Sequence, residues 1–140
     1  MKGIDDNNAG KFRKIPVKIA GTDIKLPDPV KLQDLMEQFI KYIETSKENS
    51  IEVAAKAHYE LIHIHPFTDG NGRTARLLMN LILMQSGYPP ANIKKEDRSR
   101  YLKALAGADK GDLSELYSLI LDGLDESLNT YIEFAEKSES

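Results

Sequence analysis

The 140-residue sequence contains no cysteine and no tryptophan, and only 7% of its residues are aromatic. The lack of cysteine excludes a disulfide framework, a thiolate nucleophile and a cysteine-bearing zinc site. It also agrees with a reducing compartment, so we expect a cytoplasmic protein. Any reaction that this chain catalyses must therefore use oxygen or nitrogen groups.

The sequence also lacks an excess of positive charge and any long apolar run. Its 19 Lys and Arg residues against 22 Asp and Glu residues give a formal net charge of −3. Such a chain has no broad basic field, so we expect no nucleic acid and no membrane surface among its partners. No apolar run reaches the roughly 18 residues of a membrane span, and the polar start lacks the apolar core of a signal peptide.

The length and the local composition predict one domain with a distinct beginning. A chain of 140 residues has room for one core and no second. We expect residues 1–9 to be a mobile lead-in or the edge of a longer chain, and residues 10–136 to form the domain. At about 13–26, apolar residues alternate with other residues on both sides of a turn at Ala20–Asp23, which predicts a β-hairpin. A small ribbon packed on helices and a flap that docks a peptide are equally supported interpretations of it.

After Pro27 the apolar residues recur at helical spacing to the end of the chain. Asp28 followed by Pro29, and Asn49 followed by Glu52, are typical of helix starts and predict a helix after each. The same spacing predicts three further helices, at 73–86, 96–106 and 112–136. The first of these is apolar on nearly all sides, which is typical of the centre of a bundle. We therefore expect an all-α fold, a helical bundle around a buried central helix, with a small β-hairpin.

Between two predicted helices, residues 65–76 read HPFTDGNGRTAR and combine features of a phosphate site. The glycines of Gly70–Gly72 free the backbone where a helix begins, so amide N–H groups converge at the positive end of its dipole. Arg73 and Arg76 lie on one side of that helix and add two cations suited to phosphate oxygens. This combination favours a polyphosphate ligand.

Two further side chains of this segment add chemistry to binding. Bare phosphate would repel Asp69, so its place beside the glycines indicates a Mg²⁺ ion that bridges carboxylate and phosphate oxygens. His65 carries an imidazole that titrates near neutral pH and can take a proton from an attacking hydroxyl. Acid, base, glycines and two arginines within twelve residues are hard to explain by packing alone.

Each feature also has a plainer interpretation. Gly-Asn-Gly often marks a turn or a helix cap, and arginines on one side of a helix are often simply solvated. His58, His63 and His65 are potential zinc ligands, but on a helix no consecutive pair of them shares a face. His58 lies on an apolar stripe, which predicts a hydrogen-bonded core histidine. Thr68 and Thr74 are nearby hydroxyls, but no third group completes a triad.

The segment matches the signature of the Fic-domain family, His-Pro-Phe-x-(Asp/Glu)-Gly-Asn-(Gly/Lys)-Arg-x-x-Arg, at every specified position, so the chain resembles that family. The resemblance covers roughly residues 10–130. Gly10-Lys11-Phe12-Arg13 is similar to the segment before the family's flap, and LLMNLILMQSGYPP is similar to the sequence after the motif. The resemblance implies a Fic-type bundle with a hairpin flap. It also implies AMPylation, the transfer of AMP from ATP to a Ser, Thr or Tyr hydroxyl of a target protein with release of pyrophosphate.

The resemblance further implies a role for each motif residue. His65 would be the general base, and Asp69 would hold Mg²⁺ at the phosphates of ATP. Gly70, Asn71 and Gly72 would form the anion hole, with Asn71 orienting the α-phosphate. Arg73 would contact the phosphates and Arg76 would hold the γ-phosphate, while Tyr101 and Asp109 are candidates for the adenine pocket. The flap residues expected to bind the target segment by strand addition are Val17, Lys18, Ile19, Ala20, Gly21 and Thr22.

The sequence departs from many family members because it has no inhibitory motif (Ser/Thr)-x-x-x-Glu-(Gly/Asn). The nearest match, Ser118 to Asp122-Gly123, carries Asp for Glu inside a regular apolar stripe, where a helix interior is the simpler interpretation. Three explanations stay open: a separate antitoxin, an N-terminal inhibitory helix in a longer protein, and a constitutively active form. The start so close to the flap favours a shortened form without that helix.

The type of activity also has alternatives. Kinase-like relatives carry lysine at the position of Gly72, so the glycine favours AMP transfer. A non-catalytic nucleotide-binding module, removal of AMP, and transfer of another nucleotide or of phosphocholine remain open, as does a homodimer.

Overall fold

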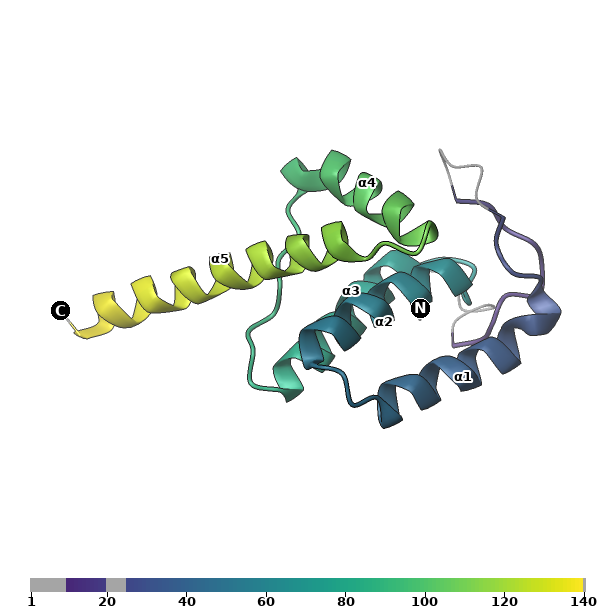
Figure 1. Ribbon diagram of the computed structural model, residues 1–140, viewed down its shortest axis with the longest axis horizontal. Helices are drawn as coiled ribbons and strands as arrows, with labels where there is room; N and C mark the ends of the chain where they lie inside the picture. The colour runs from purple at the N-terminus through teal and green to yellow at the C-terminus, as the bar shows by residue number, and fades with distance from the viewer. Residues whose placement is uncertain (1–9, 20–24, 140) are drawn as a thin grey trace. The chain divides into compact units, whose positions relative to one another are not determined.

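A computed structural model describes residues 10–19 and 25–139, and these form α-helices and short 3-10 helices without a β-strand (Figure 1). In chain order they are η1 (Pro29–Lys31), α1 (Leu32–Thr45), α2 (Ser50–Ile64), α3 (Asn71–Gln85), η2 (Lys95–Asp97), α4 (Arg98–Asp109) and α5 (Ser114–Glu139). The predicted all-α fold is confirmed, and the last three α-helices begin and end within three residues of their predicted bounds. No helix in the described ranges is both long enough and apolar enough to cross a lipid bilayer.

The hairpin predicted at 13–26 is not seen in the part of it that the structure describes. Residues 13–19 and 25–26 contain no β-strand. Pro16 lies in this segment and has no N–H to donate to a strand ladder. Ala20, Gly21 and Thr22 lie outside the described residues, as does the lead-in at 1–9. The flap therefore stays a prediction.

The contacts group the chain into two compact units, with one boundary between α1 and α2, one within α2 and one within α3. The first unit comprises Met1–Lys47 and Ala57–Leu77, and the second comprises Glu48–Lys56 and Leu78–Ser140. All motif residues from 65 to 76 belong to the first unit. The single domain predicted for residues 10–136 stays a prediction.

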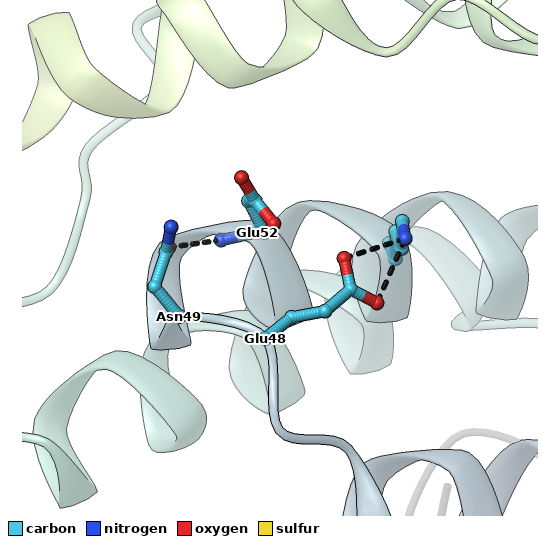
Figure 2. A network of polar contacts seen from close by, with 4 residues as sticks. Glu48, Asn49 and Glu52 are labelled. Carbon is cyan, nitrogen blue, oxygen red and sulfur yellow. Dashed lines mark hydrogen bonds and ion pairs between the residues drawn. The ribbon is translucent and has the colours of Figure 1, made fainter.

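Two predicted helix starts form through the side chains that the sequence places there. The carboxylate of Asp28 accepts a hydrogen bond of 3.1 Å from the N–H of Val30, and Pro29 opens the first turn. The amide oxygen of Asn49 accepts a hydrogen bond of 3.0 Å from the N–H of Glu52 (Figure 2). Each cap satisfies an N–H group that has no partner inside its own helix.

Helix α3 is buried on one side only. The core side chains on it are Ala75, Met79 and Leu83, each 0% exposed, and Ile82, which is 9% exposed. The opposite stripe remains open to solvent and consists of Leu77 (62% exposed), Leu81 (47%) and Met84 (54%). The prediction of burial on all sides is therefore wrong for this stripe. An apolar composition shows that a helix can be enclosed, but whether other elements cover it depends on the whole chain.

In the second unit, α4 and α5 lie side by side (Figure 1). Arg100 of α4 donates hydrogen bonds to Asp122 (2.7 Å) and Ser118 (2.9 Å) of α5. Gly123 is buried, and a Cβ atom there would lie 3.1 Å from the backbone N and O of Asn92. The stretch nearest to an inhibitory motif is thus a regular helix interior whose side chains hold α5 against its neighbours, as the simpler interpretation predicts.

Candidate active site

The loop between α2 and α3 closes on the side chain of Asn71, the first residue of α3. Asn71 is 3% exposed. Its Oδ1 accepts a hydrogen bond from the N–H of Phe67 (3.0 Å), and its Nδ2 donates one to the carbonyl of Phe67 (2.8 Å). The rings of Phe67 and Phe12 lie 6.2 Å apart, measured between centroids. The loop is thereby fixed both to α3 and to the segment around residue 12.

The first turn of α3 supplies backbone N–H groups that no helical bond uses. Gly70 precedes the helix with φ +80°, and its carbonyl accepts bonds from the N–H (2.9 Å) and the hydroxyl (2.8 Å) of Thr74. The N–H groups of Asn71, Gly72 and Arg73 come before this first helical bond. They lie at the positive end of the helix dipole, an arrangement that anions bind.

Gly72 is not required by the helix itself. Its φ is not in the left-handed region, and a Cβ atom built on it would meet no described atom within 4 Å. A side chain would therefore fit the fold. What glycine provides at this position is open space beside the N–H groups of the first turn.

Charged side chains flank this turn and remain open to solvent. The Nη2 of Arg73 lies 3.5 Å from the Oδ2 of Asp69, and the two side chains are 55% and 69% exposed. So exposed a pair contributes little to stability, and both groups stay accessible to a ligand. Arg76, one turn further along α3, is exposed as well.

The carboxylate of Asp69 fits a magnesium ion that arrives with a nucleotide. In the described ranges no group of three or more His, Asp or Glu side chains is arranged to hold a metal ion. Mg²⁺ is commonly bound by one or two carboxylates together with phosphate oxygens and water. One exposed carboxylate beside an anion-binding turn suits that mode and does not suit an all-protein metal cage.

His65 directly follows α2 and has an unusual backbone conformation. Its φ is +53°, and no other non-glycine residue in the described ranges has a positive φ. The Nδ1 of its ring lies 3.3 Å from the carbonyl oxygen of Ile62. Because a carbonyl can only accept a hydrogen bond, this contact assigns the proton to Nδ1 and leaves the lone pair on Nε2.

The surroundings of His65 keep its ring neutral. Burial lowers the pKa of this half-buried imidazole, and the charge of Arg13 lowers it further, while the bond to Ile62 acts in the opposite direction. A lowered pKa favours the neutral ring at pH 7. Nε2 is therefore ready to accept a proton, as a general base requires.

The other two histidines serve packing. His58 is fully buried, which confirms the predicted core histidine. Burial lowers its pKa to about 4; a hydrogen bond to the backbone of Ala75 opposes this shift, and the charge of Arg76 adds to it. His63 stacks on Tyr59 with ring centroids 5.6 Å apart. The described part of the chain thus gives no support to a zinc site built from histidines.

The remaining predicted site residues lie elsewhere in the chain. Tyr101 and Asp109 belong to α4 in the second unit, where Tyr101 is half-buried and Asp109 exposed. Of the flap residues that the structure describes, Val17 and Ile19 are half-buried and Lys18 is exposed. Their roles stay predictions.

One residue that contacts the site was missed by the sequence analysis. Arg13 is only 2% exposed, and its Nε donates a 2.7 Å hydrogen bond to the carbonyl of His65. The only feature of the sequence that singles out Arg13 is its place in the Gly-Lys-Phe-Arg stretch. That stretch does not predict a contact between Arg13 and His65, which lies 52 positions later.

Comparisons with known proteins show what the whole chain is similar to. Residues 1–83 match the Fic/DOC family. Protein adenylyltransferase Fic of Drosophila grimshawi is 42% identical over 132 residues, which cover 92% of this chain and 27% of that protein. The protein of the same name from Drosophila mojavensis is also 42% identical over 132 residues, covering 92% of this chain and 26% of that protein.

Two solved structures are also similar to this chain in fold and in sequence. A fragment of Fic-1 from C. elegans has a TM-score of 0.84 at 36% identity, over 97% of this chain and 40% of that one. A Fic family protein from Desulfovibrio desulfuricans has a TM-score of 0.80 at 26% identity, over 96% of this chain and 44% of that one. The chain spans about a quarter of the length of the curated relatives that it matches.

Proposed function

The chain belongs to the Fic/DOC family, and on this premise we propose that it is a protein adenylyltransferase. It transfers AMP from ATP to a Ser, Thr or Tyr hydroxyl of a target protein. The observation that carries this proposal is the pairing of a neutral His65, whose Nε2 is available, with the open first turn of α3 across one short, closed loop. A base and an anion site at the two ends of one short loop suit attack of a hydroxyl on a phosphate.

Binding of the triphosphate falls to the first turn of α3 and its arginines. The free N–H groups of residues 71–73 hold phosphate oxygens, and the open space at Gly72 lets the phosphates approach the backbone. Arg73 contacts the phosphates and Arg76 holds the γ-phosphate. Asp69 is the residue that would hold Mg²⁺, and the ion, when bound, neutralises phosphate charge and orients the triphosphate. Most catalysis of phosphoryl-type transfer is positioning and charge stabilisation of this kind.

The chemical step uses His65. Its Nε2 accepts the proton of the target hydroxyl as the hydroxyl oxygen bonds to the α-phosphorus. The bond between the α-phosphorus and the oxygen that bridges to the β-phosphate breaks, and pyrophosphate leaves with that oxygen. The bond from Nδ1 to Ile62 fixes the tautomer that makes this transfer feasible.

The target segment, the adenine, an inhibitor and the cellular location also belong to the proposed function. The target segment binds along residues 17–22, and the adenine lies near Tyr101 and Asp109. An antitoxin or an N-terminal inhibitory helix is the candidate source of inhibition, and a constitutively active form is the alternative. A homodimer is a candidate assembly, and the cytoplasm is the candidate location. Each of these proposals needs its own test.

Labelling with α-labelled ATP tests the activity. The protein is incubated with Mg²⁺, the nucleotide and a cell lysate, and label on protein is counted. We expect label with the wild type, and a loss of about 10²- to 10⁴-fold in His65→Ala, the contribution typical of a general base. His63→Ala is the matched control, because it removes a histidine that lies two residues before His65 and outside the motif. Nucleotide binding without label in any lysate would instead favour the non-catalytic binding module.

A second variant separates binding from folding. Since a Cβ atom at residue 72 meets nothing within 4 Å, we expect Gly72→Ala to fold with unchanged or slightly greater stability. ATP binding should weaken, because the methyl group occupies the space beside the N–H groups. If ATP binds equally well to Gly72→Ala, the first turn of α3 is not the phosphate site.

A further inference from the structure

Arg13 is a buried cation whose hydrogen-bond partners are all backbone carbonyls. It is the only buried Lys, Arg, Asp or Glu among the residues that the structure describes. Its guanidinium donates to four backbone carbonyls, those of Pro27 (2.6 Å), His65 (2.7 Å), Ile15 (3.2 Å) and Ile64 (3.5 Å). Burial lowers the pKa of Arg13, and the charge of Asp28 only partly opposes this. A buried cation is unfavourable unless its donors are satisfied, so Arg13 is tolerated here only because these four carbonyls accept its hydrogen bonds.

The same residue holds three consecutive carbonyls at the end of α2. Besides the side-chain bonds to Ile64 and His65, the backbone N–H of Arg13 donates a 2.8 Å hydrogen bond to the carbonyl of Pro66. The last carbonyls of a helix have no partners within it, and a cation at that end is favoured by the dipole. Arg13 therefore acts as the cap of α2, supplied from a segment 52 residues earlier in the chain.

Arg13 caps α2 at the residue of the site that has a positive φ, His65. A positive φ is unfavourable for histidine and persists only when neighbouring contacts impose it. The bonds from Arg13 flank His65 on both sides and include the short bond to its own carbonyl. The direction of the imidazole is set by this backbone conformation.

We propose that Arg13 is the positioning residue of the general base: its bonds to the carbonyls of residues 64–66 hold His65 in the left-handed conformation that presents Nε2 to the substrate. The catalytic consequence rests on the proposed function, whereas the structural part does not. Lysine cannot replace this residue, because one ammonium group cannot reach carbonyls on several sides as a planar fork does.

Kinetics of Arg13→Lys test the catalytic consequence. At saturating target, we expect kcat for AMP transfer to fall at least tenfold. The Kd for ATP, measured by equilibrium titration, should change less than about twofold, because Arg13 bonds none of the first-turn residues of α3. The matched control is Arg100→Lys, which removes bonds to Ser118 and Asp122 and leaves residues 64–66 untouched. An unchanged kcat, or equal losses in kcat and in the fraction of protein that binds ATP, would overturn the proposal.

Ring nitrogen spectra test the structural part without any activity. The chain has three histidines, so a protein labelled with ¹⁵N-histidine gives few signals to assign. In Arg13→Lys we expect the ring signals of His65 to move and the bond from Nδ1 to Ile62 to weaken, while the signals of His58 stay in place. Unchanged His65 signals would contradict the role of Arg13. If the wild type labels no protein but these spectra change as expected, the proposed function fails and the positioning contact stands.

A measurement on the wild type covers the case in which Arg13→Lys does not fold. The Nε–H of Arg13 should exchange slowly with solvent and should show a scalar coupling across the hydrogen bond to the carbonyl carbon of His65. Exchange as fast as that of the exposed Arg73, or a detected coupling to another carbonyl instead, would overturn the contact itself.

Discussion

Protonation of His58 should destabilise the fold below neutral pH. Its side chain is 0% exposed, and burial lowers its pKa from the ordinary value of 6.5 to about 4. The unfolded chain therefore takes up a proton at this residue near pH 6.5, whereas the folded chain takes it up only near pH 4. Between these values the unfolded state binds more protons, so stability is present above pH 6.5 and is lost as the pH falls.

The size of the loss follows from the shift. A difference of about 2.5 pKa units at about 1.36 kcal/mol each gives about 3.4 kcal/mol once both states are protonated. At pH 5, where only the unfolded state is protonated, the loss relative to pH 7 is about 2 kcal/mol. No discount for solvent screening applies, because the ring has no contact with water.

Urea denaturation at pH 7, 6 and 5 measures this loss. His58→Gln removes the titrating group and keeps a polar side chain, so we expect its free energy of unfolding to fall by about 2 kcal/mol less than that of the wild type over the same range. All other titrating groups are shared and cancel in the comparison. Equal pH dependence of the two proteins would refute the reasoning. A titration of the wild type by NMR that placed the His58 pKa near 6.5 would refute it as well, even if the variant failed to fold.

Three further outcomes follow from contacts described above. Gly123→Ala should lower the free energy of unfolding by about 1–3 kcal/mol, since the new Cβ crowds the backbone of Asn92 at 3.1 Å; a gain, as helix propensity alone predicts, would contradict this. Asn71→Ala should cost about 1–3 kcal/mol and speed amide exchange at Phe67, and unchanged protection there would show that the loop does not depend on the two bonds. Because the pKa of His65 is lowered from 6.5, the acid limb of kcat/KM for AMP transfer should be centred below pH 6.5; an acid limb centred above 6.5 would exclude His65 as the base.

The parts of this fold that the sequence predicts are those with local causes. Asp28 and Asn49 bind N–H groups two and three residues away, so their caps can be recognised in the sequence itself. Gly70, whose φ is +80°, likewise precedes a helix through its own backbone freedom. The core position of His58 follows from the period of its own helix. Local spacing carries enough information for all of these.

The parts that the sequence does not predict depend on contacts between distant segments. Arg13 bonds carbonyls 51 and 52 residues away in the sequence. Helical or strand periodicity cannot predict a contact between residues so far apart. The exposed stripe of α3 at Leu77 and Met84 was missed for the same reason, since residue type says nothing of which elements cover a helix. The left-handed conformation of His65 is also invisible in the sequence, because positive φ is uncommon for any non-glycine residue, even though histidine is enriched among those that adopt it.

The backbone at His65 has a consequence for how substitutions at this position are selected. A left-handed residue is most easily glycine or asparagine, and a β-branched residue is the least tolerated there. A library randomised at position 65 and sorted only for folded protein should therefore enrich Gly and Asn above His, and deplete Val and Ile. The same library sorted for AMP transfer should return His alone. Comparing the enrichment of His in the two sorted libraries measures how strongly folding disfavours the residue that AMP transfer requires.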